Sequence, residues 1–511
     1  MEKKKNSKKS VLNLTIWLVL LALILRLPLL DGSFWLDEAA QALESARPFS
    51  QQLNIIPDFQ PPLLHYILHF AMYLSKTEWW LRLVGALIPS IIAIVATYKL
   101  ATKLFDTQTA KITSLLLATS SFHIFFSQEL RPYSLAAMWA SLAFLQLHSF
   151  IFNKSSQSNF QLVPLIIINI LGLYSSYLYP FVILVQFFAV LLFRRKHMKK
   201  IFLSLIISTA SFLPFLPIFL HQLQAGQRLR TTIPGWELVV SHPQLEALPL
   251  TYSKFIYGVI PLDINITFVS ISLAILALCL ILLALLHQYY RKQEKSLKNW
   301  YFLLFLIIFS TLIPWLISFW IPVIQPKRVM YIQPLLYILF ASLITQPKTL
   351  KLLSYNILAK ILFVILLSLN IYGTYQYFTQ PKLQRENWRE LVAYSKARLP
   401  NSGKTVMLFA FDEPFAPWRW YANEHFDTFS TGNSTPTTLN KTQDLIKPIF
   451  KYQFVAVFDY LRDLTDPNDF IPQAVESFGY EEFEVIDYPN IGFVRVYTKD
   501  KQLLMSSLET N

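Results

Sequence analysis

The sequence predicts an α-helical polytopic membrane protein with a small α/β domain at its C-terminal end, and three observations predict it. The chain is 54% hydrophobic and only 15% charged, whereas typical soluble proteins carry about 25% charged residues. Apolar stretches of roughly bilayer-spanning length recur along the first three quarters of the chain, about eleven in all. Beyond Pro381 these stretches stop, and the composition becomes that of a soluble module.

The apolar stretches define the expected membrane helices in order. The first one has the length of a signal peptide, but no small-residue cleavage pattern follows it and further stretches do. We therefore interpret it as a retained helix and expect a multi-span membrane domain over residues 1–380. The stretches lie at residues 11–30, 79–100, 109–126, 134–152, 160–178, 179–193, 201–220, 264–287, 300–321, 330–345 and 355–377.

Lysine and arginine residues cluster before the first stretch and after the second, sixth and eighth. Because cytoplasmic loops are enriched in these residues, the N-terminus is expected in the cytoplasm, and an odd number of spans places the C-terminal domain outside the cell (cytoplasmic or inner) membrane. The net charge of +14 is then explained by membrane topology, and no nucleic-acid partner is expected. The clusters are Lys3, Lys4, Lys5, Lys8 and Lys9; Lys99, Lys103 and Lys111; Arg194, Arg195, Lys196, Lys199 and Lys200; and Arg291, Lys292, Lys295 and Lys298.

Residues 381–511 are expected to form the extracytoplasmic α/β domain. Period-two and helical patterns alternate in this region, and its roughly 130 residues are enough for one small domain. No glycine-rich phosphate loop is present. Helices are expected at Glu386–Arg398 and Phe470–Phe478, and strands at Thr405–Phe411, Phe454–Asp459, Glu482–Tyr488 and Gly492–Tyr497.

The first expected outer loop, residues 31–78, contains the adjacent acids Asp37 and Glu38 just after the first membrane stretch. Carboxylates at a membrane boundary are costly unless they are solvated or used. One carboxylate could act as a general base while the other orients the nucleophile or a cation. An interfacial loop with two solvated acids would give the same pattern. Asp58 follows in the same loop, on a backbone stiffened by Pro61-Pro62, and could equally be a turn residue.

Further polar residues gather at expected outer ends of the membrane helices. Glu129, Arg131 and Tyr133 surround Pro132 at the start of one helix, where Arg131 could hold a phosphate with two hydrogen bonds. Arg82, Lys327 and Arg328 also lie on the outer side, against the usual bias of membrane loops. An anionic lipid phosphate would account for them. A second outer loop, residues 221–263, has the features of a lid and also those of a simple connector.

Metal ligands are scarce in this sequence. The only cysteine, Cys279, lies in an apolar stretch, so neither a disulfide nor a cysteine-based metal site is expected. His65 and His69 are four residues apart on one helix face and could join Asp37, but no third firm ligand is visible. We therefore expect no obligatory metal or other cofactor, and consider His65 a candidate substrate-binding residue.

Together these motifs resemble the polytopic glycosyltransferases with the C-type fold. The shared pattern is the Asp37-Glu38 pair, then Asp58, Pro61, Pro62, Leu63 and Tyr66, then Leu81-Arg82-Leu83. The segment Ser127–Tyr133 narrows the resemblance to glycosyltransferase family 39, the protein mannosyltransferase-like group, and bacterial relatives such as the aminoarabinose transferases of lipid A. The match covers roughly residues 30–150 and is weaker at Lys327-Arg328 and around Trp388-Arg389.

This resemblance implies transfer of a sugar from a polyprenyl-phosphate carrier to a lipid, glycan or protein acceptor outside the membrane, with inversion at the anomeric carbon. It also implies that Asp37 is the catalytic acid–base residue. The residues suit this chemistry, since the arginines could offset the charge of the leaving phosphate and a single displacement needs one carboxylate base.

Three alternatives remain at the level of the sequence. A lipid-linked-sugar transporter would place ionisable residues within its spans and show repeated halves, whereas here the charges gather at the outer rim. A surface-glycan polymerase or ligase would be expected to keep its key residues in a later outer loop. A non-catalytic scaffold would have no use for the clustered acids and arginines. The sequence does not reveal the sugar, the carrier length or the acceptor.

Overall fold

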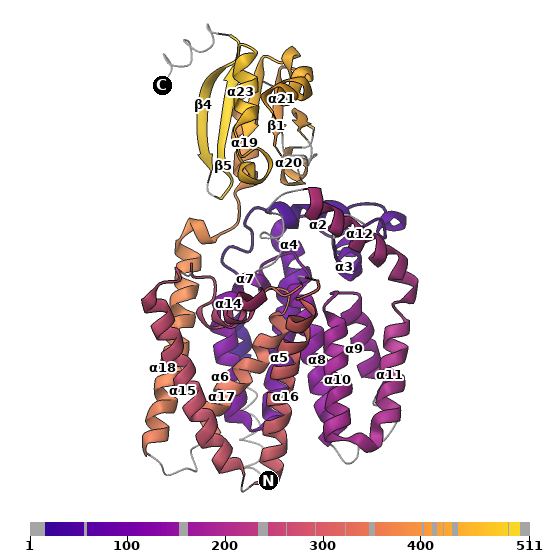
Figure 1. The fold of residues 1–511 in the computed structure, drawn as a ribbon, viewed down its shortest axis with the longest axis vertical. Helices are drawn as coiled ribbons and strands as arrows, with labels where there is room; N and C mark the ends of the chain where they lie inside the picture. Colours follow the sequence, from indigo (N-terminus) through magenta and orange to yellow (C-terminus); the bar gives the residue numbers. More distant parts are fainter. Residues whose placement is uncertain are drawn as a thin grey trace.

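The membrane part of the chain is a bundle of helices, and the C-terminal domain sits at one end of it (Figure 1). The computed structural model describes residues 16–500 apart from several short gaps. Undescribed residues are 56–58, 153–161, 233–243, 262, 292, 322, 347–352, 401–402, 411–415, 423, 432–437 and 489, together with the side chains of 197, 229–232, 295, 353, 464 and 465.

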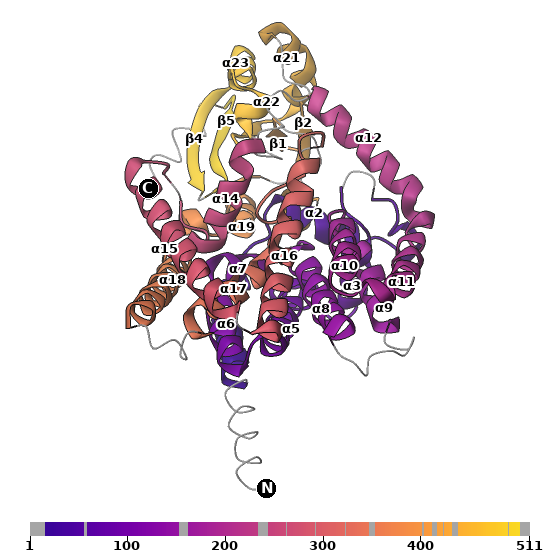
Figure 2. The ribbon, with the colours of Figure 1, turned by 60° about the horizontal axis from the view of Figure 1, so that its bottom comes forward.

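Six helical segments of the described part are long and apolar enough to cross a membrane, so the protein is a multi-pass membrane protein and the predicted fold class is confirmed. In Figures 1 and 2, α15 and α18 flank one side of the bundle and α11 the other. The long segments are Glu78–Leu104 (α4, η3 and α5), Tyr133–Phe152 (α8), Met198–Arg228 (α11 into α12), Ile266–Tyr290 (α15), Ser296–Ile317 (within α16, Glu294–Ile317) and Ser354–Thr379 (within α18, Leu353–Thr379).

Several expected spans are shorter or divided in the structure. Proline occupies the first turn of three short apolar helices, where its missing N–H costs nothing: Val163–Leu173 (α9), Tyr179–Phe193 (α10) and Gln333–Thr345 (α17). The stretch expected at 109–126 is not one helix. It forms Thr107–Thr119 (α6) and Ser121–Ser127 (α7), because Ser120 is extended and its side chain caps α7. Because of this break, α7 is a separate short helix that ends at Ser127, just before the polar residues Glu129 and Arg131.

The first loop folds into Leu36–Ser45 (α2), Phe49–Gln51 (η1) and Leu63–Ala71 (α3). It packs onto Glu78–Arg82 (α4) and the π-helical turn Leu83–Leu87 (η3). At Gly85, a Cβ would lie 3.0 Å from Leu130 and 3.2 Å from Leu64 and Leu68. Glycine therefore permits the close approach that holds this loop against the bundle. Leu216–Thr232 (α12) and Gln244–Tyr257 (α14) belong to the second expected outer loop and its flanks.

The C-terminal domain is a five-stranded mixed sheet in the order β2-β1-β3-β5-β4. The first three strands, β1 (Thr405–Phe409), β2 (Asp427–Ser430) and β3 (Phe454–Phe458), are parallel, and β5 (Gly492–Thr498) is antiparallel to both β3 and β4 (Glu481–Tyr488). Strand β2 was not predicted from the sequence, because it is a four-residue edge strand with no buried residue.

Helices cover both faces of this sheet. Met407 and Phe409 of β1 pack towards Trp388–Arg398 (α19) and Ala416–Ala422 (α20). Val406 and Leu408 point the other way, towards Leu439–Ile446 (α21) and Phe470–Ser477 (α23). Alternation along a strand gives each face of the sheet its own core. The remaining short helices are Arg195–His197 (η5), Leu213–Phe215 (η6), Met330–Ile332 (η7), Pro381–Leu383 (η9), Lys447–Lys451 (η10) and Arg462–Thr465 (α22).

Candidate active site

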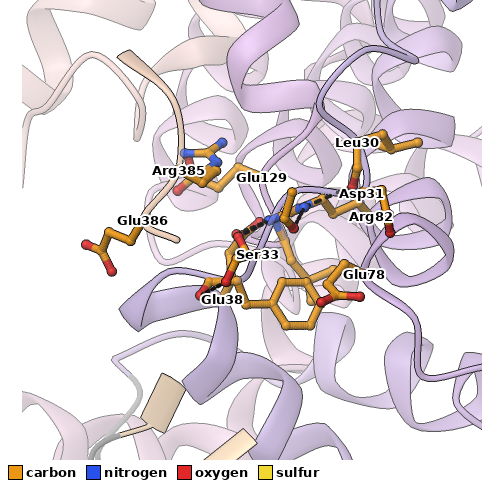
Figure 3. A network of polar contacts seen from close by, with 12 residues as sticks. Leu30, Asp31, Ser33, Glu38, Glu78, Arg82, Glu129, Arg385 and Glu386 are labelled. Carbon is orange, nitrogen blue, oxygen red and sulfur yellow. Dashed lines mark hydrogen bonds and ion pairs between the residues drawn. The ribbon is translucent and has the colours of Figure 1, made fainter. Parts of the chain in front are cut away.

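A fully buried ion pair anchors the start of α2. The Arg82 Nη2 atom lies 2.5 Å from Glu38 Oε2, and its Nε atom donates to Glu38 Oε1 at 2.9 Å. The remaining Arg82 N–H groups donate to the carbonyls of Leu30, Gly32 and Ser33, so all five of its donors are used within the protein (Figure 3). Arg82 therefore has no N–H left for a substrate phosphate, which does not fit the role considered for it from the sequence.

Glu38 is equally committed. Its Oε1 atom also accepts the Leu130 N–H at 2.7 Å, and its side chain has no exposed surface. Burial acts to raise the pKa of Glu38, but the Arg82 guanidinium outweighs burial, and the pKa lies below its ordinary value. The carboxylate is therefore charged and occupied. It joins three chain segments, the α2 turn, α4 and the loop before α8.

Asp37, the adjacent acid, has a different environment. Its side chain is 36% exposed, and its Oδ2 atom lies 4.0 Å from Arg131 Nε. The Arg131 Nη1 atom also donates to the Asp37 carbonyl at 3.4 Å. Helical geometry explains the contrast, because consecutive residues in a helix point about 100° apart. Glu38 therefore faces the protein interior, whereas the Asp37 side chain is partly exposed.

A cluster of cations lies near Asp37. Lys327 and Arg328 lie in the loop before η7, which begins at Met330, and Tyr133 begins α8. The Lys327 Nζ atom lies 5.8 Å from the centre of the Trp35 ring and 5.6 Å from that of Tyr133. Tyr133 raises the pKa of Lys327 against the effect of burial, with smaller contributions from Glu129 and Asp37 in the same direction. Lys327 is therefore protonated.

Glu129 is buried beside this cluster and pairs with Arg385, a residue that was not among the sequence candidates. The Arg385 Nη1 atom lies 3.3 Å from Glu129 Oε2, and the guanidinium carbon stacks 3.8 Å from the centre of the Phe125 ring. Burial raises the pKa of Glu129, although Arg385 and Lys327 act against it. Arg385 follows the last span on the expected outer side, and the charge-bias argument applied to Arg82 and Lys327 would have found it.

Glu129, Lys327 and Arg385 line a cavity of about 290 Å³ between the membrane bundle and the segment that leads to the C-terminal domain. Its lining includes three aromatic side chains, two acids and two cations. Such a mixture suits a polar ligand with apolar ring faces, because aromatic rings stack and charged groups bind hydroxyl or phosphate oxygens. The lining residues are Trp35, Phe125, Phe126, Glu129, Lys327, Gln384, Arg385, Glu386 and Asn490.

One sequence candidate, His65, lies away from the cavity. His65 is fully buried, and its Nδ1 atom is 2.9 Å from Gln41 Nε2, within a polar network that also includes Gln60. It contributes to the packing of α2 against α3 and does not line the cavity. Asp58 lies outside the described residues. Among the residues that the structure describes, no three His, Cys, Asp or Glu side chains gather as a metal site would require.

Comparisons with known proteins agree with this architecture. Residues 59–221 match the family model described as dolichyl-phosphate-mannose-protein mannosyltransferase. The crystal structure of ArnT from Cupriavidus metallidurans bound to undecaprenyl phosphate superposes with a TM-score of 0.56 and 12% identity, covering 96% of this chain and 98% of that chain. The chain has the fold of the polytopic glycosyltransferases. The resemblance predicted from the sequence is thereby confirmed.

Two structures from Archaeoglobus fulgidus also match. The oligosaccharyltransferase AglB in complex with an inhibitory peptide and a dolichol-phosphate has a TM-score of 0.54 and 13% identity, covering 97% of this chain and 75% of that chain. The oligosaccharyltransferase complex with Zn and sulfate has a TM-score of 0.55 and 13% identity, covering 96% and 73%. No curated protein sequence matches the chain.

Proposed function

We propose that this protein transfers a sugar from a polyprenyl-phosphate carrier to a lipid, glycan or protein acceptor on the outer side of the cell membrane, with inversion of the anomeric carbon. The observation that carries the proposal is the difference in environment between Asp37 and Glu38. The Glu38 carboxylate is fully buried in an ion pair with Arg82, whereas the Asp37 side chain is 36% exposed beside Arg131. The ligands named for the similar structures, undecaprenyl phosphate and dolichol-phosphate, support a lipid phosphate as the donor.

The proposed reaction is a single displacement. An acceptor hydroxyl attacks the anomeric carbon, its proton passes to the Asp37 carboxylate, and the bond from the anomeric carbon to the phosphate oxygen breaks. Polyprenyl phosphate leaves with the bonding electrons, so negative charge develops on it in the transition state. We assign Arg131, Lys327 and Arg328 to offset that charge, because cations fixed in a partly buried site stabilise it better than water does.

The proposal assigns Arg82 and Glu38 to positioning and leaves donor binding to the other cations. Arg82 uses all its donors on Glu38 and three backbone carbonyls. We also propose that transfer needs no divalent metal. The Asp37 surroundings are already cationic, and both Glu38 oxygens are engaged, so these acids do not offer a divalent ion the ligands it prefers. Zinc is bound by the archaeal oligosaccharyltransferase, which shares the fold at 13% identity.

Replacing Asp37 with Asn tests the proposal. The amide keeps the size of the side chain but cannot accept the proton, so transfer should fall by about two to four orders of magnitude, the usual contribution of a positioned base. The donor is undecaprenyl phosphate that carries a radioactive hexose, and the acceptors are supplied by membranes from cells that lack the protein. The rate of transfer is the radioactivity that appears in these acceptors. Purified variants and EDTA-containing buffer would be used throughout.

The matched control is Glu44→Gln, because Glu44 lies in the same helix α2 but pairs with Arg47, away from the cavity. It should transfer at the wild-type rate. Wild-type turnover by Asp37→Asn would remove Asp37 as the base. Turnover that appears only after a divalent cation is added back would contradict the metal-free mechanism and make Asp37 a metal ligand.

A further inference from the structure

The segment that carries Asp37 is held from above by residues more than 300 positions later in the chain. The Arg389 backbone N–H donates to Ser33 Oγ at 3.1 Å, and the Phe34 N–H donates to Tyr421 Oη at 2.8 Å. Tyr421 donates in turn to Glu78 Oε1 at 2.8 Å, and Arg389 also pairs with Glu78 at 3.1 Å. The C-terminal domain therefore forms hydrogen bonds with Ser33 and Phe34, which lie just before α2.

Glu386 makes the last of these contacts, at the first turn of α2 itself. Its Oε2 atom accepts the Leu36 N–H at 3.3 Å and the Trp388 indole N–H at 2.7 Å. Its Oε1 atom accepts the Tyr460 hydroxyl at 2.7 Å, and Tyr460 follows β3 of the C-terminal domain. Glu386 also lines the cavity, with Glu129, Lys327 and Arg385.

The first turn of α2 has no cap of its own. Trp35 occupies the N-cap position and makes no side-chain hydrogen bond to the helix. The first N–H groups of a helix have no partner within the helix, and a carboxylate at that end also interacts favourably with the helix dipole. Glu386 therefore supplies, from a distant segment, a side-chain acceptor for the first N–H of this helix, at an end where Trp35 supplies none.

We propose that Glu386 is a positioning residue whose carboxylate fixes the first turn of α2, and with it the placement of Asp37, in a way that depends on the docked C-terminal domain. The inference rests on the proposed transferase function and deepens it. Leu36 and Asp37 are adjacent, so a turn released at Leu36 carries the Asp37 carboxylate away from its place beside Arg131. Displacement of a reacting group by about 1 Å can cost up to about a hundredfold in rate.

The hydrogen bond between Glu386 and the Leu36 N–H depends on pH. All three partners of Glu386 are donors, so they bind the charged carboxylate more strongly than the protonated acid. Burial raises the pKa of Glu386 to about 7, against the opposing effect of Tyr460 and Trp388, and the charge of Asp37 raises it further. The charged groups that face it are Asp37 from α2 and, across the cavity, Glu129, Lys327 and the adjacent Arg385. Protonation removes the negative charge that the three donors share and weakens the bond to Leu36. The hold on α2 therefore strengthens as pH rises through 7.

The test compares Glu386→Gln with wild type from pH 5.5 to 8.5. Wild-type kcat should rise through an inflection near pH 7, whereas Glu386→Gln should lose about tenfold or more in kcat at pH 8 and show no inflection there. The KM for undecaprenyl-phosphate hexose should change less than threefold, because the cations that bind phosphate are untouched. Tyr460→Phe removes a donor that favours the charged form, so its inflection should move to higher pH.

A second measurement needs no turnover. Hydrogen exchange of the peptide that spans the start of α2 should be faster in Glu386→Gln than in wild type at pH 8, and the difference should shrink at pH 5.5. The control is Glu390→Gln, since Glu390 lies in α19 and bonds Asn387 instead of α2. It should match wild type in both measurements.

The outcomes separate the two proposals. If wild type transfers sugar, and Glu386→Gln retains both the wild-type pH profile and wild-type exchange at α2, the positioning role is overturned while the transferase function stands. If no protein transfers sugar but exchange at α2 follows Glu386 as expected, the proposed function fails while Glu386 still fixes the turn. Equal exchange in wild type and Glu386→Gln overturns the inference whatever the activity.

Discussion

At the residue scale, two neighbouring acids in one helical turn differ in burial and in hydrogen-bond partners. Glu38 is enclosed by Arg82 and the Leu130 N–H, while Asp37 keeps over a third of its side chain exposed. A buried carboxylate is tolerated only with such complete partnering. The ion pair thus ties Glu38 of α2 to the bundle and helps to hold Asp37, the proposed base, in place.

The cations can be separated by mutation in the same way. Arg82→Ala leaves the Glu38 charge buried without its partner, which costs about 3–5 kcal/mol, so we expect poor folding and a lowered melting temperature. Lys327→Ala should fold normally but bind undecaprenyl phosphate about tenfold to a hundredfold more weakly, because a hydrogen bond to a charged group is worth about 1.5–3 kcal/mol. Thermal unfolding in detergent and titration with undecaprenyl phosphate measure the two effects. Unchanged affinity in Lys327→Ala would reject its assignment to the phosphate.

At the scale of elements, the site depends on how α2 is clamped between the bundle and the C-terminal domain. Below it, Gly85 in the π-helical turn lets α3 and the loop before α8 approach. Above it, Phe34 of the first loop and Trp420 of α20 have ring centres 5.7 Å apart, and Ala416 and Tyr421 join the same apolar cluster. Since α2 has few internal turns, these contacts supply most of its stability.

Tyr421→Phe tests the upper half of this clamp. Loss of one hydroxyl leaves the Phe34 N–H without its acceptor and removes a bond to Glu78. An unsatisfied buried N–H costs about 1–3 kcal/mol, so the melting temperature should fall and proteolysis near the start of α19 should become faster. Tyr394→Phe is the control, because its hydroxyl bonds Glu484 within the C-terminal domain. Equal effects of the two substitutions would mean that Tyr421 has no special part in docking.

At the scale of the whole molecule, the arrangement makes a prediction about topology. The first loop and the C-terminal domain lie at one end of the bundle, while the turn between α15 and α16 lies at the other (Figure 1). With Cys279 replaced by Ala, cysteines introduced at the exposed Ser50 and Asp444 should react with an impermeant maleimide in intact cells. A cysteine at the exposed Gln293 should react only after permeabilisation, because the lysine and arginine bias predicts a cytoplasmic position for that turn. Labelling of Gln293→Cys in intact cells would invert the topology and contradict the proposed function.

Much of this fold follows from local pattern. The long spans such as Ile266–Tyr290 are apolar throughout, and the strands β1 and β3 are continuous buried runs, so chain-local hydrophobicity predicts both. The sequence also predicts that polar residues gather at one end of the bundle. It fails at Asp427–Ser430 and at the break in the 109–126 stretch, where a short edge strand and one capping serine carry little periodic signal.

By itself, the sequence determined the membrane class, the C-terminal module, the family resemblance and the Asp37-Glu38 pair. Only the tertiary structure decided which acid is exposed, that Arg82 is saturated while Lys327 lines the cavity, and that Arg385 and Glu386 return from the end of the last span to complete its wall. The physical reason is that hydrophobic pattern acts within one helix or strand. Burial, ion pairing and the pKa of a carboxylate instead depend on segments that meet in space across more than 300 residues of chain.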